Sequence, residues 1–168
     1  MVVELPAAVA GYESWSADWA WGLPIIVLNV IIHVLGLGRI GVLLKRISNP
    51  TFTHRHPSME FSIVVGTATL LATFLHAVEV SIWAFAFRAL NAVPDARTAM
   101  LYSLNAVTSY GHVSIELAYH WQLMGALEAL NGWLLFGLTT AFLFAIMEKI
   151  WSMDKTTEAA AKKAAAGA

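Results

Sequence analysis

Three long apolar segments constrain the fold of this chain more than any other feature of its sequence. They run from about residue 21 to 44, from about residue 61 to 87 and from about residue 121 to 147. A helix needs about 20 mostly apolar residues to cross the hydrocarbon core of a bilayer, and each segment is longer than that. Tryptophans stand near the ends of the first and third segments: Trp15, Trp19, Trp21, Trp121 and Trp151. Because tryptophan favours the membrane interface, we predict an all-α membrane protein with three transmembrane helices.

The composition supports a membrane protein and argues against several other classes. Hydrophobic residues make up 58% of the sequence and charged residues 12%, whereas soluble domains have roughly 45–50% and about 25%. The chain has no cysteine, which excludes disulfides and thiolate metal ligands. It has no basic cluster large enough to bind a phosphate backbone and no nucleophile–base arrangement. We therefore expect a lipid bilayer around the chain, no nucleic-acid partner and no enzymatic activity.

The placement of lysine and arginine predicts how the chain is oriented. Seven basic residues lie between the first two segments and after the third: Lys45, Arg46, Arg55, Lys149, Lys155, Lys162 and Lys163. The opposite side carries only Arg88 and Arg97. Cytoplasmic loops carry the excess of basic residues, so we expect the N-terminus outside the cell and the C-terminus in the cytoplasm.

A polar interruption, Ser103 to His112, separates the second and third apolar segments. Backbone that is not a regular helix survives at membrane depth only where protein buries it or water lines it. Pro94 and Asp95 indicate a helix start, because proline suits the first turn and an acidic residue suits the positive end of the helix dipole. We therefore predict a short helix from Arg97 to Val107, followed by a polar loop.

A span, a short helix, a polar loop and a second span form the layout of the pore-loop potassium channel superfamily, and the residues of this chain resemble its motifs. The family filter, Thr-Val-Gly-Tyr-Gly followed by Asp, aligns with Val107, Thr108, Ser109, Tyr110, Gly111 and His112. Residues 132–141 are similar to the G-x-x-x-F-G-L-x-T-A pattern of the inner helix in bacterial potassium channels. Glu128 and Gly132 match an E-A-x-x-G pattern of one-pore channel-like proteins. The resemblance covers roughly residues 62–150.

The resemblance implies a passive cation channel in the bacterial inner membrane. Residues 107–111 would be the selectivity filter of a homotetramer and His112 its outer mouth. A monovalent cation such as K⁺ would permeate, and no cofactor would be needed. Glu128 would support the filter, and Gly132 would be the gating hinge. Packing of the inner helix would involve Phe136, Gly137 and Thr140.

With this resemblance the chain divides into five parts. An extracytoplasmic segment (1–20) precedes the first transmembrane helix (21–44) and a cytoplasmic loop (45–60). A pore module (61–150) contains the second transmembrane helix, a re-entrant pore helix with its filter loop, and the third transmembrane helix. The chain ends in a low-complexity cytoplasmic tail (151–168).

Three residues of the predicted filter region differ from the potassium-channel motif, and they leave ion selectivity open. Ser109 replaces a glycine whose backbone angles, if left-handed, would cost a serine roughly 1–2 kcal/mol. Val107 stands where the family has a threonine, unless a one-residue deletion gives that role to Thr108. His112 replaces an aspartate that would attract cations. A non-conducting, channel-like accessory subunit is therefore an alternative function.

A second polar group lies within the first two apolar segments. Asn29 and His33 are four residues apart, and His76 and Glu79 are three apart, so each pair shares a helix face. In antiparallel spans the two pairs would lie at matching depths. Four roles fit these residues: interhelical hydrogen bonding, proton sensing, metal binding or haem binding. A membrane haem or metal protein using His33, His76 and Glu79 is thus a further alternative, although we predict no metal for the leading function.

The histidine at the predicted outer mouth generates a pH prediction. Four imidazoles at that position become positive as the pH falls through roughly 8 to 5, which repels cations. We expect acidification over this range to reduce cation flux into liposomes. His112→Asn is expected to remove that dependence, and an unchanged pH profile in this variant would contradict the assignment.

Overall fold

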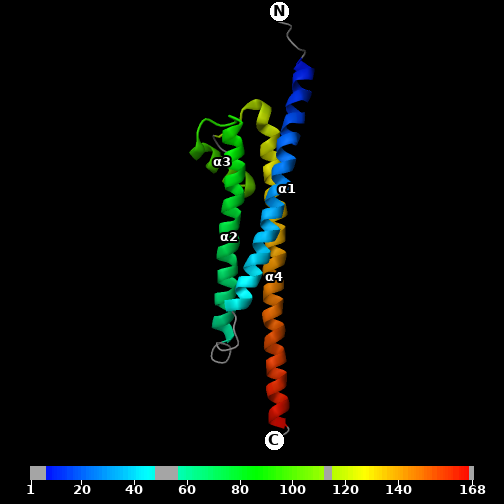
Figure 1. Ribbon diagram of the computed structural model, residues 1–168, viewed down its shortest axis with the longest axis vertical. Helices are drawn as coiled ribbons and strands as arrows, with labels where there is room; N and C mark the ends of the chain where they lie inside the picture. Colours follow the sequence, from blue (N-terminus) through cyan, green and yellow to red (C-terminus); the bar gives the residue numbers. More distant parts are fainter. Residues whose placement is uncertain (1–6, 48–56, 112–114, 167–168) are drawn as a thin grey trace, which may run out of the picture. The chain divides into compact units, whose positions relative to one another are not determined.

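The part of the chain that the structure describes is mostly helical. The computed structural model describes residues 7–47, 57–111 and 115–166, and no strand occurs within these ranges (Figure 1). The elements in chain order are α1 (Ala7–Ile47), α2 (Pro57–Ala89), α3 (Ala96–Val107), the 3₁₀ turn η1 (Tyr119–Trp121) and α4 (Gln122–Ala166).

Three of these helices are long and apolar enough to cross a membrane. The candidate spans are Trp15–Arg46, Phe61–Ala89 and Tyr119–Ser152. This confirms the prediction of an all-helical chain with three candidate membrane helices. The helices extend beyond the predicted apolar segments because a helix ends where its capping and propensity require, not where hydrophobicity falls. The alanine-rich tail continues α4 as far as Ala166 because alanine is the strongest helix former.

The chain forms two compact units, and α1, α2 and α4 each contribute to both. Unit 1 comprises residues 1–34 and 75–136, and unit 2 comprises residues 35–74 and 137–168. In unit 2 the buried apolar residues come from α1 and α2: Leu37, Ile40, Leu44, Val64, Ala68 and Ala72. The ring of Phe61 stacks on Trp151 of α4, with ring centroids 6.2 Å apart.

Unit 1 contains α3 and the main apolar core. The core is contributed by α2, α3, α4 and the turns between them: Trp83, Ala84, Phe87, Ala92, Val93, Ala99, Tyr102, Ala106, Leu117, Trp121, Met124 and Leu127. The ring of Phe87 meets Tyr102 edge to face at 5.3 Å, which joins α2 to α3. The short helix is therefore packed into the core of unit 1 beside the end of α2 (Figure 1).

Capping residues determine where α2 ends and where α3 begins. Asn91 has a φ of 52°, and the amides of Asn91 and Ala92 donate to the carbonyls of Arg88 and Phe87. This is a Schellman cap, for which asparagine tolerates the left-handed angle. Asp95 then accepts a hydrogen bond of 3.0 Å from the Thr98 amide as the N-cap of α3. The predicted start of the short helix is confirmed.

The N-cap of α3 can be tested by substitution. The hydroxyl and amide of Thr98 hold the pKa of the Asp95 carboxyl below its usual value. A lowered pKa means that the cap stabilises the fold above about pH 4 and loses this effect as the pH falls further. We expect Asp95→Ala to lower the thermal midpoint in detergent at pH 7, and Asp95→Asn to preserve it because asparagine also caps helices. The gap between Asp95→Ala and the wild type should narrow below about pH 4.

Candidate functional site

The end of α3 has the hydrogen bonds of a second Schellman cap. The amide of Ser109 donates to the carbonyl of Ala106, and the amide of Tyr110 donates to that of Asn105, both at 3.0 Å. Ser109 has a φ of 54° and Gly111 a φ of 89°. Ser109 therefore adopts a left-handed conformation, at the position where the channel motif has its first glycine. For a serine this conformation is uncommon.

The first two residues of the predicted filter are helical in this structure. Val107 is the last residue of α3, and Thr108 is its C-cap, with a φ of −83° and a ψ of −5°. The Thr108 hydroxyl donates to the carbonyl of Leu104 at 2.7 Å. An extended ladder of carbonyls over residues 107–111 is thus not present in the single chain. The filter assignment stays a prediction, and His112 lies outside the described residues.

Two neighbouring residues of α4 hold the end of α3 and the start of the loop. A Cβ atom placed on Gly132 would lie 2.5 Å from the carbonyl oxygen of Val107 and 2.9 Å from its Cα. Only glycine allows this approach of two backbones. The next residue, Trp133, donates a hydrogen bond of 2.9 Å from Nε1 to the hydroxyl of Ser109. Gly132 therefore has a packing role here, and its predicted role as a hinge stays a prediction.

The same face of α4 accommodates α3 over two helical turns. Gly125, Glu128 and Gly132 are spaced at intervals of three and four, which places them on one side of the helix. A Cβ on Gly125 would overlap the hydroxyl of Tyr102. Small residues at such positions allow helices to approach closely. Sequence inspection singled out Glu128 and Gly132 but missed Gly125, whose spacing of seven from Gly132 was the available signal.

Buried polar atoms accumulate at this contact between α3 and α4. Glu128 and Asn131 of α4 and Ser103 of α3 are all fully buried. The Glu128 carboxyl lies close to the side chains of Ser103 and Tyr102 of α3. Among the described residues, neither carboxyl oxygen of Glu128 and neither polar atom of the Asn131 amide has a hydrogen-bond partner. Burial of polar atoms without hydrogen-bond partners lowers stability, so polar side chains in such positions usually have a structural or functional role.

An acidic residue of α1 caps the beginning of α4. Asp18 is buried, and its Oδ1 accepts a hydrogen bond of 3.2 Å from the amide of Met124. The amides of the first helical turn lack partners within the helix, and a carboxylate there also complements the helix dipole. From the sequence alone, no role was assigned to Asp18. Its position among three tryptophans at the start of an apolar span was the signal of a buried role.

The residues predicted to pack the inner helix lie in different surroundings. Phe136 belongs to unit 1, and its ring centroid lies 4.7 Å from that of His76 on α2. Gly137 and Thr140 belong to unit 2 and are exposed in the single chain. No atom lies within 4 Å of a Cβ placed on Gly137, its helix neighbours excluded. Within the described part of the chain, Gly137 therefore has no close packing partner outside its own helix.

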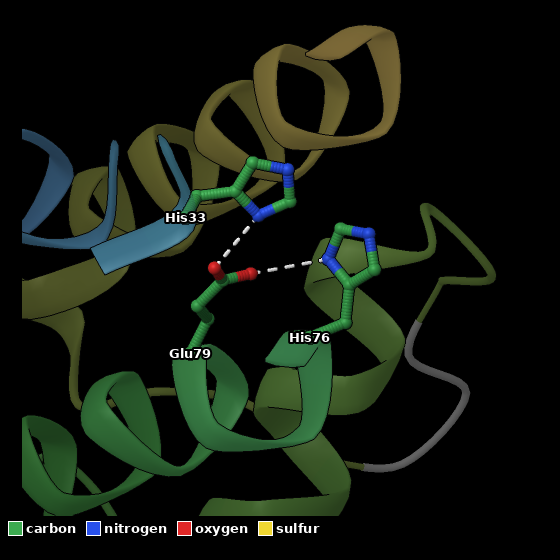
Figure 2. A group of neighbouring side chains, drawn as sticks. All are labelled: His33, His76 and Glu79. Atoms are coloured by element: carbon green, nitrogen blue, oxygen red, sulfur yellow. Dashed lines mark hydrogen bonds and ion pairs between the residues drawn. The ribbon is translucent and has the colours of Figure 1, made fainter. Parts of the chain in front are cut away.

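The structure brings His33, His76 and Glu79 together in unit 1. His33 Nδ1 donates to Glu79 Oε1 at 2.8 Å, and His76 Nδ1 lies 3.1 Å from Glu79 Oε2. The two imidazole rings are 5.1 Å apart between centroids and tilted by 41°. Figure 2 shows the carboxylate of Glu79 facing both rings, with each oxygen directed at one of them. The side chain of Asn29 donates to the backbone carbonyl of Glu79 at 3.4 Å.

The structure thus brings Asn29 and His33 of α1 against His76 and Glu79 of α2, as the residue spacing predicted. His33 and Glu79 are almost fully buried, with 0% and 2% of their side chains exposed, while His76 is 13% exposed. Among the described residues these three side chains form a group able to hold a metal ion, since one donor atom from each lies within 4.8 Å of the others.

Comparisons of the chain with protein-family models, with curated proteins and with solved structures gave no match.

The close contact at Gly132 predicts a specific sensitivity to substitution. Gly132→Ala would force α4 away from the Val107 backbone, and overpacking of this kind costs about 1–3 kcal/mol. We expect thermal or denaturant unfolding in detergent to show that loss. Gly66→Ala is the matched control, because nothing lies within 4 Å of a Cβ there and alanine favours helix by up to about 1 kcal/mol. Equal effects of the two variants would contradict the contact.

The backbone of Ser109 predicts an unusual order of stability. Ser109→Gly and Ser109→Ala both remove the hydroxyl that accepts from Trp133, but only glycine adopts a positive φ without strain. We expect Ser109→Gly to be more stable than Ser109→Ala by about 1–2 kcal/mol in the same unfolding assay. The reverse order would show that residue 109 does not have the left-handed conformation in the folded chain.

Proposed function

We propose that this chain is the subunit of a passive cation channel, in which four copies surround an axis and the loop after α3 controls ion passage. The observation that carries the proposal is the left-handed backbone of Ser109. Strained residues of this kind collect at functional sites. Ser109 and Gly111, the residues with positive φ within 107–111, fall on the two glycines of the potassium-channel motif that this segment resembles.

The support given to the loop is consistent with the same function. Gly132 lies against the backbone of Val107, and Trp133 binds the hydroxyl of Ser109. An ion filter replaces the hydration shell of the ion with oxygen atoms, so these oxygens need a firmly positioned backbone. A loop fixed to a long helix at two adjacent residues meets that requirement better than a free connection between spans.

The direction of α3 favours a cation over an anion. The loop follows the C-terminal end of α3, where the helix dipole places a partial negative charge. One chain provides one such helix end and one loop. A closed ring of identical subunits would bring several together around an axis, and four is the number that the resemblance implies.

A non-conducting, channel-like subunit is the second candidate, and one observation favours it. Val107 belongs to α3, and Thr108 has helical backbone angles. The carbonyls of these two residues therefore do not line up as in an extended filter. In this alternative the capped loop holds an assembly together and passes no ions. The resting loop of the single chain is compatible with this reading.

Flux measurements on reconstituted protein distinguish the two candidates. The purified chain is inserted into liposomes with outward K⁺ or Na⁺ gradients, and its assembly state is measured by cross-linking in the same membranes. The channel predicts tetramers that pass cations and exclude chloride, and the ratio of the K⁺ and Na⁺ rates reports the selectivity. Tetramers without flux across a range of pH would remove the channel and leave the second candidate.

A pair of tyrosine variants localises the ion path. Tyr110 and Tyr119 are 82% and 84% exposed in the single chain, so replacing either removes little intrachain packing. We expect Tyr110→Ala, within the loop, to change the flux or the K⁺ to Na⁺ ratio several-fold. Tyr119→Ala, outside the loop, should leave both unchanged. Identical behaviour of the two variants would place the ion path elsewhere.

A further inference from the structure

We propose that His33, His76 and Glu79 form a binding site for a divalent transition-metal ion of the zinc type. One nitrogen from each imidazole and one carboxylate oxygen would be the protein ligands. His33 belongs to α1, and the other two residues belong to α2. All three fall within the residues of unit 1. This proposal is independent of ion conduction by the loop, and either one can fail without the other.

The donor atoms lie close enough together to converge on one small metal ion. Nitrogen and oxygen ligands bind zinc at about 2.0–2.2 Å in a tetrahedral arrangement, which places neighbouring donors about 3.3 Å apart. One donor atom from each of the three side chains lies within 4.8 Å of the others, and each Nδ1 lies 2.8 or 3.1 Å from one oxygen of the Glu79 carboxylate. Binding through Nδ1 requires each imidazole proton to move to Nε2 and the donor atoms to shift by about 1–2 Å through side-chain rotation. No helix has to move by a full turn to complete the site.

The charge of the group also favours a cation. In the arrangement with both Nδ1 atoms protonated and neutral, the three side chains carry the single negative charge of Glu79. Among the described residues, the ion-pair partners of Glu79 are the two histidines alone. An isolated buried charge is strongly unfavourable, and coordination of a metal ion is one of the ways in which proteins compensate it. The burial of Glu79 and His33 therefore strengthens the attraction of the group for a positive ion.

The donor set selects the class of ion. Imidazole nitrogen suits zinc, copper, iron and nickel, whereas Mg²⁺ and Ca²⁺ prefer oxygen ligands throughout. Two histidines and one carboxylate leave a fourth tetrahedral position, which a water molecule fills in many zinc proteins. Neighbouring side chains limit the space, because the Phe136 ring lies 4.7 Å from that of His76.

The same geometry fits a single ion better than a haem. Axial histidines of a haem lie on opposite faces of the porphyrin, with their coordinating nitrogens directed at each other through the iron. Here both Nδ1 atoms face the same carboxylate, and the rings are tilted by 41° with centroids 5.1 Å apart (Figure 2). This arrangement leaves no room for a porphyrin plane between them.

Binding can be measured on the full chain purified without a histidine tag, first treated with a chelator and then titrated with Zn²⁺ or Co²⁺. Calorimetry gives the number and affinity of the sites for Zn²⁺, and the visible spectrum of Co²⁺ gives the coordination geometry. We expect one ion per chain and an intense tetrahedral Co²⁺ spectrum. Glu79→Gln and His76→Gln should each weaken binding by at least about 100-fold, since loss of outer partners alone costs about 10–100-fold.

A third histidine provides the matched control. His120 lies in unit 1, is exposed and stands outside the cluster, so His120→Gln should bind Zn²⁺ as the wild type does. If a cluster variant unfolds, the wild-type Co²⁺ spectrum and the increase of its thermal midpoint with Zn²⁺ still decide the question. The proposal is overturned by an absence of saturable binding to the wild type, by an octahedral Co²⁺ spectrum, or by binding that persists in the folded Glu79 and His76 variants. None of these three results depends on whether the liposomes show cation flux.

Discussion

The architecture of unit 1 depends on the contact between the backbones of Gly132 and Val107. Without a Cβ at residue 132, α4 can touch the last turn of α3, and this contact places the start of the loop. Gly125 repeats the arrangement two turns earlier, where it leaves room for the hydroxyl of Tyr102. The ring of the same Tyr102 meets Phe87 of α2 edge to face. A short helix that could not fold alone is thus held between two long ones.

Polar side chains join the helices of unit 1 at points where hydrophobic packing cannot specify a register. Asp18 fixes α1 to the first turn of α4, and Glu79 joins α1 to α2 through His33. In a membrane the apolar effect does not distinguish one helix neighbour from lipid, so hydrogen bonds and close packing decide which faces meet. An ion at the histidine–glutamate cluster would strengthen the same connection that the hydrogen bond already makes.

Much of this fold could be predicted from the sequence because its signals are local. The three apolar segments are long enough to identify spans, Asp95 after Pro94 indicates a helix start, and the i, i+3 and i, i+4 spacings place the histidine–glutamate group on facing surfaces. The role of Gly125 and the cap that Asp18 provides depend on which helices become neighbours, which no local pattern specifies. The helical backbone of Thr108 differs from the extended carbonyl ladder of an ion filter, because in the single chain Thr108 caps the end of α3.

The two Schellman caps of unit 1 show why Ser109 stands out. Asn91 and Ser109 occupy the same position in the same hydrogen-bond pattern, with φ angles of 52° and 54°. Asparagine visits this conformation readily, and serine does not. The need to end a helix therefore does not by itself explain the serine, because the cap of α2 has asparagine at the same left-handed position, and asparagine tolerates that conformation better. What distinguishes Ser109 is the bond that its hydroxyl accepts from Trp133. The strain at this residue is thus associated with fixing the loop to α4, which is the support that the proposed filter would need.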